Sequence, residues 1–142
     1  MSEWRRHVMA TFPERHAILS RATSIHDLWF TLLQDLQHSY APVEDSGTLR
    51  DKIWEFASWC FDKRRHSEIR NAVAVSFYEH LPHHGPARRE LPSRLTRPAF
   101  IELLPAFRTT LTPDEYSTFV TEFLTALGEP KASIQEVLSA AS

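Results

Sequence analysis

The stretch from Ser67 to Leu81, SEIRNAVAVSFYEHL, decides the fold expected for this chain. At 100° per residue it places apolar side chains on almost every side of a helix. One stripe consists of Ile69, Val73, Phe77 and Leu81, and most of the remaining surface consists of Ala72, Ala74, Val75 and Tyr78. A helix that is apolar all round is packed on several sides. We therefore expect a helix over 67–81 to be the central element of a helical domain, enclosed by its neighbours.

Periodic apolar stretches on both sides of this segment predict the neighbouring helices. The firmest lie at about 24–40, 48–61 and 113–127, with shorter or weaker ones at 3–11, 14–21 and 98–104 and a further turn through 111. The sequence Thr112-Pro113-Asp114-Glu115 is typical of a helix start, because the threonine caps the helix and the glutamate can bond back to it. No alternating pattern is long enough to build a sheet.

Residues 1–142 are expected to form a single compact all-α domain of six to eight helices. Short links favour antiparallel αα-hairpins, arranged either as a bundle or as a HEAT-like arc. Segment 82–98 holds four prolines and one glycine, and we expect a long irregular loop there. Residues 129–142 form either a short helix over 134–140 or a frayed tail.

Composition and charge narrow the function classes. The formal net charge is −2, so a nucleic-acid partner, which needs a basic surface, is not expected. The single cysteine, Cys60, allows no internal disulfide and fits a buried thiol. A signal-like N-terminus and an apolar run of about 18 residues are both missing, so we expect a cytoplasmic protein without membrane contact. No motif calls for a cofactor.

Two sequence blocks carry a resemblance to a known family. Trp59-Cys60-Phe61 and the run from Asn71 to Pro82, NAVAVSFYEHLP, resemble a family of small uncharacterised bacterial proteins. The similarity extends to the helix around Asp114–Phe123 and covers about 24–127. The resemblance implies a small, cytosolic, helical protein with no assigned chemistry. Proteins of this general kind often act as immunity or antitoxin partners of secreted toxins, which is an expectation by association.

The densest group of potential metal ligands lies at the end of the central stretch. It comprises Glu79, His80, His83 and His84. Zinc sites use His and Glu ligands, but Pro82 interrupts the helical spacing between His80 and His83, and no second ligand cluster occurs. The alternative interpretation is structural: His80 is a hydrogen-bonded core histidine, while His83 and His84 cover a helix end.

Tyr78, Glu79 and His80 also suggest acid/base chemistry. Consecutive helical residues point about 100° apart, so all three cannot reach one substrate atom, and a catalytic role needs partners from another helix. We expect Glu79 to form a structural ion pair or hydrogen bond, with Glu79 and His80 the first candidates if a pocket exists. Ser76, one turn before His80, is a very weak catalytic signal.

Three surface features suggest partner binding. Asp51, Glu55 and Asp62 form an acidic strip on the helix over 48–61, with Glu44 and Asp45 nearby, and Arg88 and Arg89 belong to a basic segment that could bind an anion or an acidic partner. Phe30 points away from the apolar stripe of its own helix. It is either an exposed anchor for a partner or a side chain covered by the N-terminal segment.

The leading hypothesis is a non-enzymatic protein-binding module of a bacterial cytosolic protein, and its sharper form is an immunity-type inhibitor of a toxin. The binding residues would be Asp51, Glu55, Asp62, Arg88, Arg89 and Phe30. The alternative is a small enzyme, or a ligand- or metal-binding protein, that uses Glu79 and His80, with His80, His83 and His84 as the metal ligands.

Overall fold

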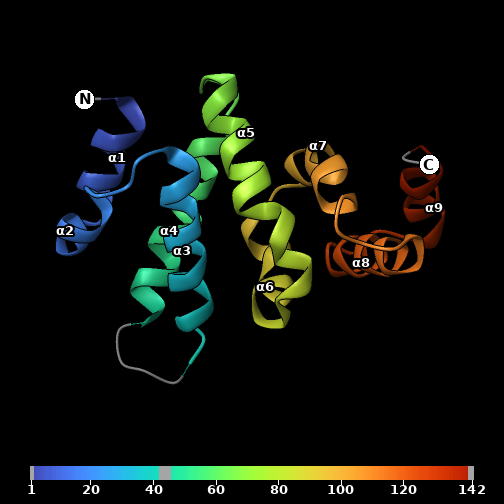
Figure 1. Ribbon diagram of the computed structural model, residues 1–142. Coiled ribbons are helices and arrows are strands. Elements are labelled where there is room, and N and C mark those ends of the chain that lie inside the picture. The colour runs from blue at the N-terminus through green and yellow to red at the C-terminus, as the bar shows by residue number, and fades with distance from the viewer. Residues whose placement is uncertain (1, 42–45, 141–142) are drawn as a thin grey trace. The chain divides into compact units, whose positions relative to one another are not determined.

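The computed structural model describes residues 2–41 and 46–140, and within these ranges the regular elements are all helical. The chain forms two compact units, Met1–Phe77 and Tyr78–Ser142, where the sequence predicted one domain. Figure 1 shows the helices in chain order. The all-α class is confirmed, and the boundary between the units falls inside the stretch that was expected to be one central helix.

Unit 1 contains α1 (Glu3–Thr11), the single turn η1 (Pro13–Arg15), α2 (His16–Leu19), α3 (Ile25–His38), α4 (Ser46–Phe61) and α5 (Ser67–Ser76). The last three helices pack against one another, as Figure 1 shows. Their shared core is aromatic, with ring centroids of Trp29 and Phe77 4.7 Å apart and those of Trp29 and Phe56 5.2 Å apart. Such pairs add to the stabilisation from burial alone. Cys60 is buried in this unit, as predicted.

The central helix is shorter than predicted. It ends at Ser76, and a 3₁₀ turn, η2 (Tyr78–His83), follows it in unit 2. At the C-cap of α5, Phe77 leaves the helical conformation and its ring turns inward toward Trp29 and Trp54. Pro82, which lacks the N–H that a continuing α-helix needs, lies farther on, inside η2. Val75 is 42% exposed, so the helix is buried on one face and is not enclosed on every side.

Unit 2 contains η2 followed by α6 (Gly85–Arg94), α7 (Arg97–Arg108), α8 (Pro113–Ala126) and α9 (Lys131–Ala140). Its core is a cluster of four phenylalanines from α7 and α8. Phe100 and Phe123 stack with centroids 3.6 Å apart, and Phe107 meets Phe119 at 4.9 Å. The capping box predicted for α8 is present, because Thr112 Oγ1 accepts from the Glu115 amide and Glu115 Oε1 accepts from the Thr112 amide.

One expectation about unit 2 is wrong. The segment 82–98 is not an irregular loop, since it holds the end of η2, helix α6 and the first residues of α7. Pro86 occupies the first turn of α6, where no backbone donor is needed, and Ala87 and Leu91 are buried one turn apart. Of the two alternatives for the C-terminal segment, the structure shows the helix: α9 covers Lys131–Ala140, starts three residues earlier than predicted, and buries Ile134.

Candidate functional site

The residues first suspected of metal binding do not form a metal site. Glu79, His80 and His84 are half-buried and His83 is exposed. His83 Nε2 lies 2.8 Å from Thr110 Oγ1, which donates to the Glu79 carbonyl oxygen at 3.4 Å. Among residues 2–41 and 46–140, no three His, Cys, Asp or Glu side chains gather to hold a metal ion. The alternative of metal ligation by His80, His83 and His84 is therefore not supported.

The serine that the sequence paired with His80 has a different histidine partner. Ser76 Oγ lies 2.7 Å from Nδ1 of His26, which joins the end of α5 to the start of α3. Ser76 is only 2% exposed, so its hydroxyl is closed to a substrate. This contact, which no sequence spacing could reveal, ties two helices together.

The acidic strip on α4 is only partly retained. Asp51 and Glu55 are exposed on α4, one turn apart. Asp62 lies beyond the end of that helix, where its carboxylate accepts from the Arg64 guanidinium and from the Arg64 amide, both at 2.9 Å. These hydrogen bonds lower the pKa of Asp62 to about 2. Glu44 and Asp45 lie outside the described residues.

The two arginines of the basic segment have different roles. Arg88 forms a two-pronged ion pair with Glu122 at 2.9 and 3.0 Å and also donates to the Pro82 carbonyl at 3.1 Å. It therefore links α6 to α8 and to the end of η2. Arg89 is exposed. In unit 1, Phe30 is 53% exposed, so it is not covered by the N-terminal segment.

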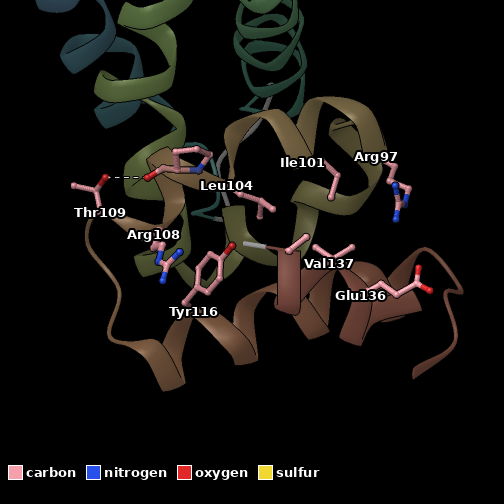
Figure 2. Close-up of a pocket in the computed structure, with 10 residues that line it drawn as sticks. Arg97, Ile101, Leu104, Arg108, Thr109, Tyr116, Glu136 and Val137 are labelled. Carbon is pink, nitrogen blue, oxygen red and sulfur yellow. Dashed lines mark hydrogen bonds between the residues drawn. The ribbon is translucent and has the colours of Figure 1, made fainter. Parts of the chain in front are cut away.

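One hollow in the described residues is a groove of unit 2 that the sequence did not indicate. Helix α8 packs against both α7 and α9, and the space between these two helices is a cavity of about 710 Å³. Figure 2 shows its side chains. The lining consists of Arg97, Ile101, Leu104, Pro105, Arg108, Thr109, Tyr116, Glu136, Val137 and Ala140. The volume falls in the range of ligand pockets in proteins.

The sequence of α7 explains why one of its faces is free to line the groove. Thr96 caps the helix by accepting from the Ala99 amide at 3.3 Å. The core side of α7 carries Phe100, Leu103, Leu104 and Phe107, all buried. Arg97, Ile101, Pro105 and Arg108 recur at steps of three and four residues, so they lie along a neighbouring face. Sequence reasoning missed this face because it divided 98–111 at Pro105.

The two ends of the groove are polar and its middle is apolar. In Figure 2, Arg97 and Glu136 lie at one end, Arg108, Thr109 and Tyr116 at the other, and Ile101, Leu104 and Val137 between them. The Arg97 guanidinium donates to Glu129 at 2.8 Å. The groove therefore has an apolar body with charged side chains at both ends, and the charge of Arg97 is balanced by Glu129.

Tyr116 is the most unusual side chain of the groove. It is 6% exposed, and its hydroxyl is buried without a hydrogen-bond partner. Figure 2 shows the ring rising from α8 with its hydroxyl directed toward α7. Burial raises the pKa of this phenol, so the group is a neutral donor. A buried hydroxyl without a hydrogen-bond partner lowers the free energy of unfolding by about 1–3 kcal/mol. Such a group in a native protein therefore needs an explanation, for example a bound ligand.

A smaller cavity of about 290 Å³ adjoins the same end of the groove. It shares Arg108 and Tyr116 and is otherwise lined by Leu111, Pro113, Ser117 and Leu138. A third cavity of about 310 Å³ lies around Arg88, Arg89 and Phe123. Tyr116 and Arg108 thus lie between the groove and the cavity of about 290 Å³. The sequence correctly predicted that Tyr116 is buried, but nothing in it signals the missing partner.

Comparisons of the chain with family models, with curated proteins and with solved structures yield no match. The family resemblance of residues 59–61 and 71–82 therefore remains an expectation. Over the described ranges, the structure contains no helix with both the length and the apolar character required to cross a bilayer.

Proposed function

We propose that this protein is a non-enzymatic binding protein that holds an apolar ligand in the groove between α7 and α9. The observation that carries the proposal is the unpartnered hydroxyl of Tyr116 beside an apolar cavity of ligand size. Ligand pockets commonly combine an apolar lining with a few polar groups that fix orientation. The groove has this composition.

A binding role is favoured over catalysis by the side chains around the groove. Its lining offers Arg, Glu, Thr and Tyr side chains but no histidine, cysteine or serine. Covalent catalysis needs an accessible nucleophile beside a base. In the Ser76–His26 pair of unit 1, which resembles such a combination, the serine is only 2% exposed. Glu79 and His80, the earlier catalytic candidates, are absent from the lining.

The proposal is tested by titrating the protein with small apolar probes, beginning with decanoate and decanol, and recording methyl NMR spectra. We expect saturable shifts of the Ile101, Leu104 and Val137 methyl signals, while methyls of unit 1 stay in place. The variant Val137→Trp fills the groove and should abolish the shifts. Val75→Trp, at an exposed site in unit 1, is the matched control. Shifts spread over both units, or unchanged by Val137→Trp, would contradict the proposal.

A second candidate function is the recognition of a protein partner by unit 1, with an immunity-type inhibitor as its sharper form. It is supported by the 53% exposure of Phe30 and by the exposed carboxylates of Asp51 and Glu55. Large aromatic side chains are common anchors of interfaces, and opposite charge speeds association. A cytoplasmic setting in a bacterium belongs to this hypothesis.

This second candidate is tested with the product of any neighbouring toxin-like gene as the purified partner. Phe30→Ala should weaken the complex by at least about tenfold if the ring is an anchor. The pair Asp51→Asn and Glu55→Gln should slow association and reduce its salt dependence. The matched control is Ile18→Ala, another exposed apolar side chain of unit 1. Equal losses for Phe30→Ala and Ile18→Ala would reject Phe30 as the anchor.

A further inference from the structure

We propose that helix α9 is the lid of the α7–α9 groove. It undocks from α8 by rotation at the link between these two helices, which admits a ligand, and it closes again over the bound molecule. This inference rests on the proposed function and adds how the groove opens.

The packing of α9 is weaker than that of the other two helices around the groove. Four side chains of α7 and five of α8 are buried, whereas Ile134 is the buried residue of α9. Helix α9 packs chiefly on α8. Segments with few buried apolar contacts open at the lowest free energy, and the lids of binding sites are drawn from such segments. We therefore expect α9 to open without the rest of unit 2.

The link between α8 and α9 localises the rotation. Helix α8 ends at Ala126 and α9 begins at Lys131. Gly128 has a φ of 83°, the left-handed conformation that favours glycine, and this residue turns the chain at the end of α8. The amides of Gly128 and Glu129 donate to carbonyls of α8 at 2.9 and 3.0 Å. The first half of the link thus stays with α8, and rotation falls on Glu129 and the exposed Pro130.

Three side chains, which we call the clasp, span this point of rotation. Glu129 Oε2 accepts from the Arg97 guanidinium at 2.8 Å, and Glu129 Oε1 accepts from the Ser133 hydroxyl at 2.7 Å. Arg97 begins α7 and Ser133 lies in the first turn of α9. One carboxylate therefore joins the starts of the two helices that line the groove, and its loss should favour the open form.

A ligand in the groove holds the lid closed. Figure 2 shows Ile101 and Leu104 on one side of the groove and Val137 on the other, and Ala140 of α9 also belongs to the lining. A molecule between these side chains contacts both walls only while α9 is docked. A ligand that binds one form of a protein stabilises that form. Ligand binding and opening of α9 should therefore oppose each other.

The test is amide hydrogen exchange of the full chain, followed residue by residue by NMR. An isolated helix of ten residues is marginal in water, so undocking of α9 appears as exchange of its amides. We expect the amides from Gln135 to Ser139 to exchange faster than the core amides of α7 and α8, with similar protection along the segment. Decanol at about ten times its dissociation constant should slow this exchange about elevenfold, because only the closed form binds it. Simple fraying would instead give protection that falls toward Ala140 and does not respond to decanol.

The clasp is tested with Glu129→Gln and a matched control. The Arg97–Glu129 pair is partly exposed, so its loss should raise the population of the open form about two- to fivefold. Exchange of α9 and both the association and the dissociation of decanol should accelerate by this factor, while the affinity stays nearly unchanged. Glu122→Gln breaks the Arg88–Glu122 pair of the same unit and should leave α9 as in the parent chain. Equal exchange of the α7 and α8 core amides in all three proteins shows that unit 2 remains folded.

The outcomes separate this inference from the proposed function. If decanol shifts the groove methyls but α9 exchanges as slowly as α8, or its exchange does not respond to decanol, the groove is a binding site and the lid is overturned. If neither decanol nor decanoate binds, the proposed function and the role of α9 as a lid fail together. If Glu129→Gln and Glu122→Gln affect α9 equally, the clasp does not hold the lid.

Discussion

The hydrophobic cores of the two units are packed in different ways. In unit 1, the rings of Trp29, Trp54, Phe56 and Phe77 bring α3, α4 and α5 together. In unit 2, four phenylalanines hold α7 on α8, but α9 contributes only Ile134 as a buried side chain. A helix anchored by one residue leaves space at its flank. The groove therefore arises where aromatic packing ends.

All four tryptophans belong to unit 1, at positions 4, 29, 54 and 59. Tryptophan emission therefore reports on unit 1 alone, whereas the helical circular dichroism signal reports on both units. The unfolding of each unit can therefore be followed separately. Single substitutions in one unit then test whether the other unit responds.

The largest effect is expected from Phe100→Ala in the core of unit 2. Phe100 is fully buried and contacts Phe107, Phe119 and Phe123, so its truncation should cost about 3–5 kcal/mol. In urea unfolding, part of the circular dichroism signal should be lost at lower urea while the tryptophan transition stays in place. A common shift of both signals would mean that the two units unfold together.

Cys60 provides an independent readout of the same substitution. It is the only cysteine of the chain, it is buried in unit 1, and burial raises the pKa of its thiol far above the ordinary value. Its reaction with a disulfide reagent therefore requires unit 1 to open. The rate should be the same in the parent chain and in Phe100→Ala. A faster reaction in the variant would show that damage to unit 2 opens unit 1.

A smaller effect is expected from Thr112→Ala at the start of α8. The substitution removes the oxygen that accepts from the Glu115 amide, so unit 2 should lose about 0.5–2 kcal/mol. Thr118→Ala, at an exposed position within α8, is the matched control and should be near neutral. Circular dichroism melts of both variants give the difference. An equal melting temperature for the two would show that the cap does not stabilise the unit.

The sequence predicted those features of the fold that depend on local patterns. The start of α8 followed from Thr112-Pro113-Asp114-Glu115, and the apolar periodicity of α3 and α4 located the core of unit 1. Proline was the main source of error. Pro86 and Pro92 suggested a loop, yet one lies in the first turn of α6 and the other is accommodated inside that helix.

The candidate site could not be predicted because it depends on how helices pack. The periodicity of α7 identifies its buried face, but not that the adjacent face lies opposite α9. The burial of Tyr116 was predictable from its place on α8, whereas the lack of a partner for its hydroxyl is a property of the assembled unit. The contact of His26 with Ser76 likewise joins residues fifty positions apart.

The smallest effect, and the one that best separates the units, is their response to mild acid. The His7 ring stacks on Trp59 with centroids 4.1 Å apart, and burial, together with the charge of Arg65, lowers the pKa of His7. A histidine that is harder to protonate when folded contributes stability above its ordinary pKa of 6.5, and this contribution is lost as the pH falls below that value. In unit 2, the lowered pKa of Glu115 changes the stability of that unit only when the pH falls below 4.5, the ordinary pKa of this group.

Between pH 7 and pH 5, the tryptophan transition of the parent chain should therefore move to lower urea relative to that of His7→Gln. Burial raises the pKa of Asp35, so this group changes the stability of unit 1 with pH in the opposite direction. Comparison of the parent chain with His7→Gln is therefore needed to isolate the effect of the histidine. His16→Gln, at an exposed position, should behave as the parent chain does. If the parent and His7→Gln respond equally to pH, the stacked ring is not the acid-sensitive group, and the pH dependence of unit 1 must come from elsewhere in its core.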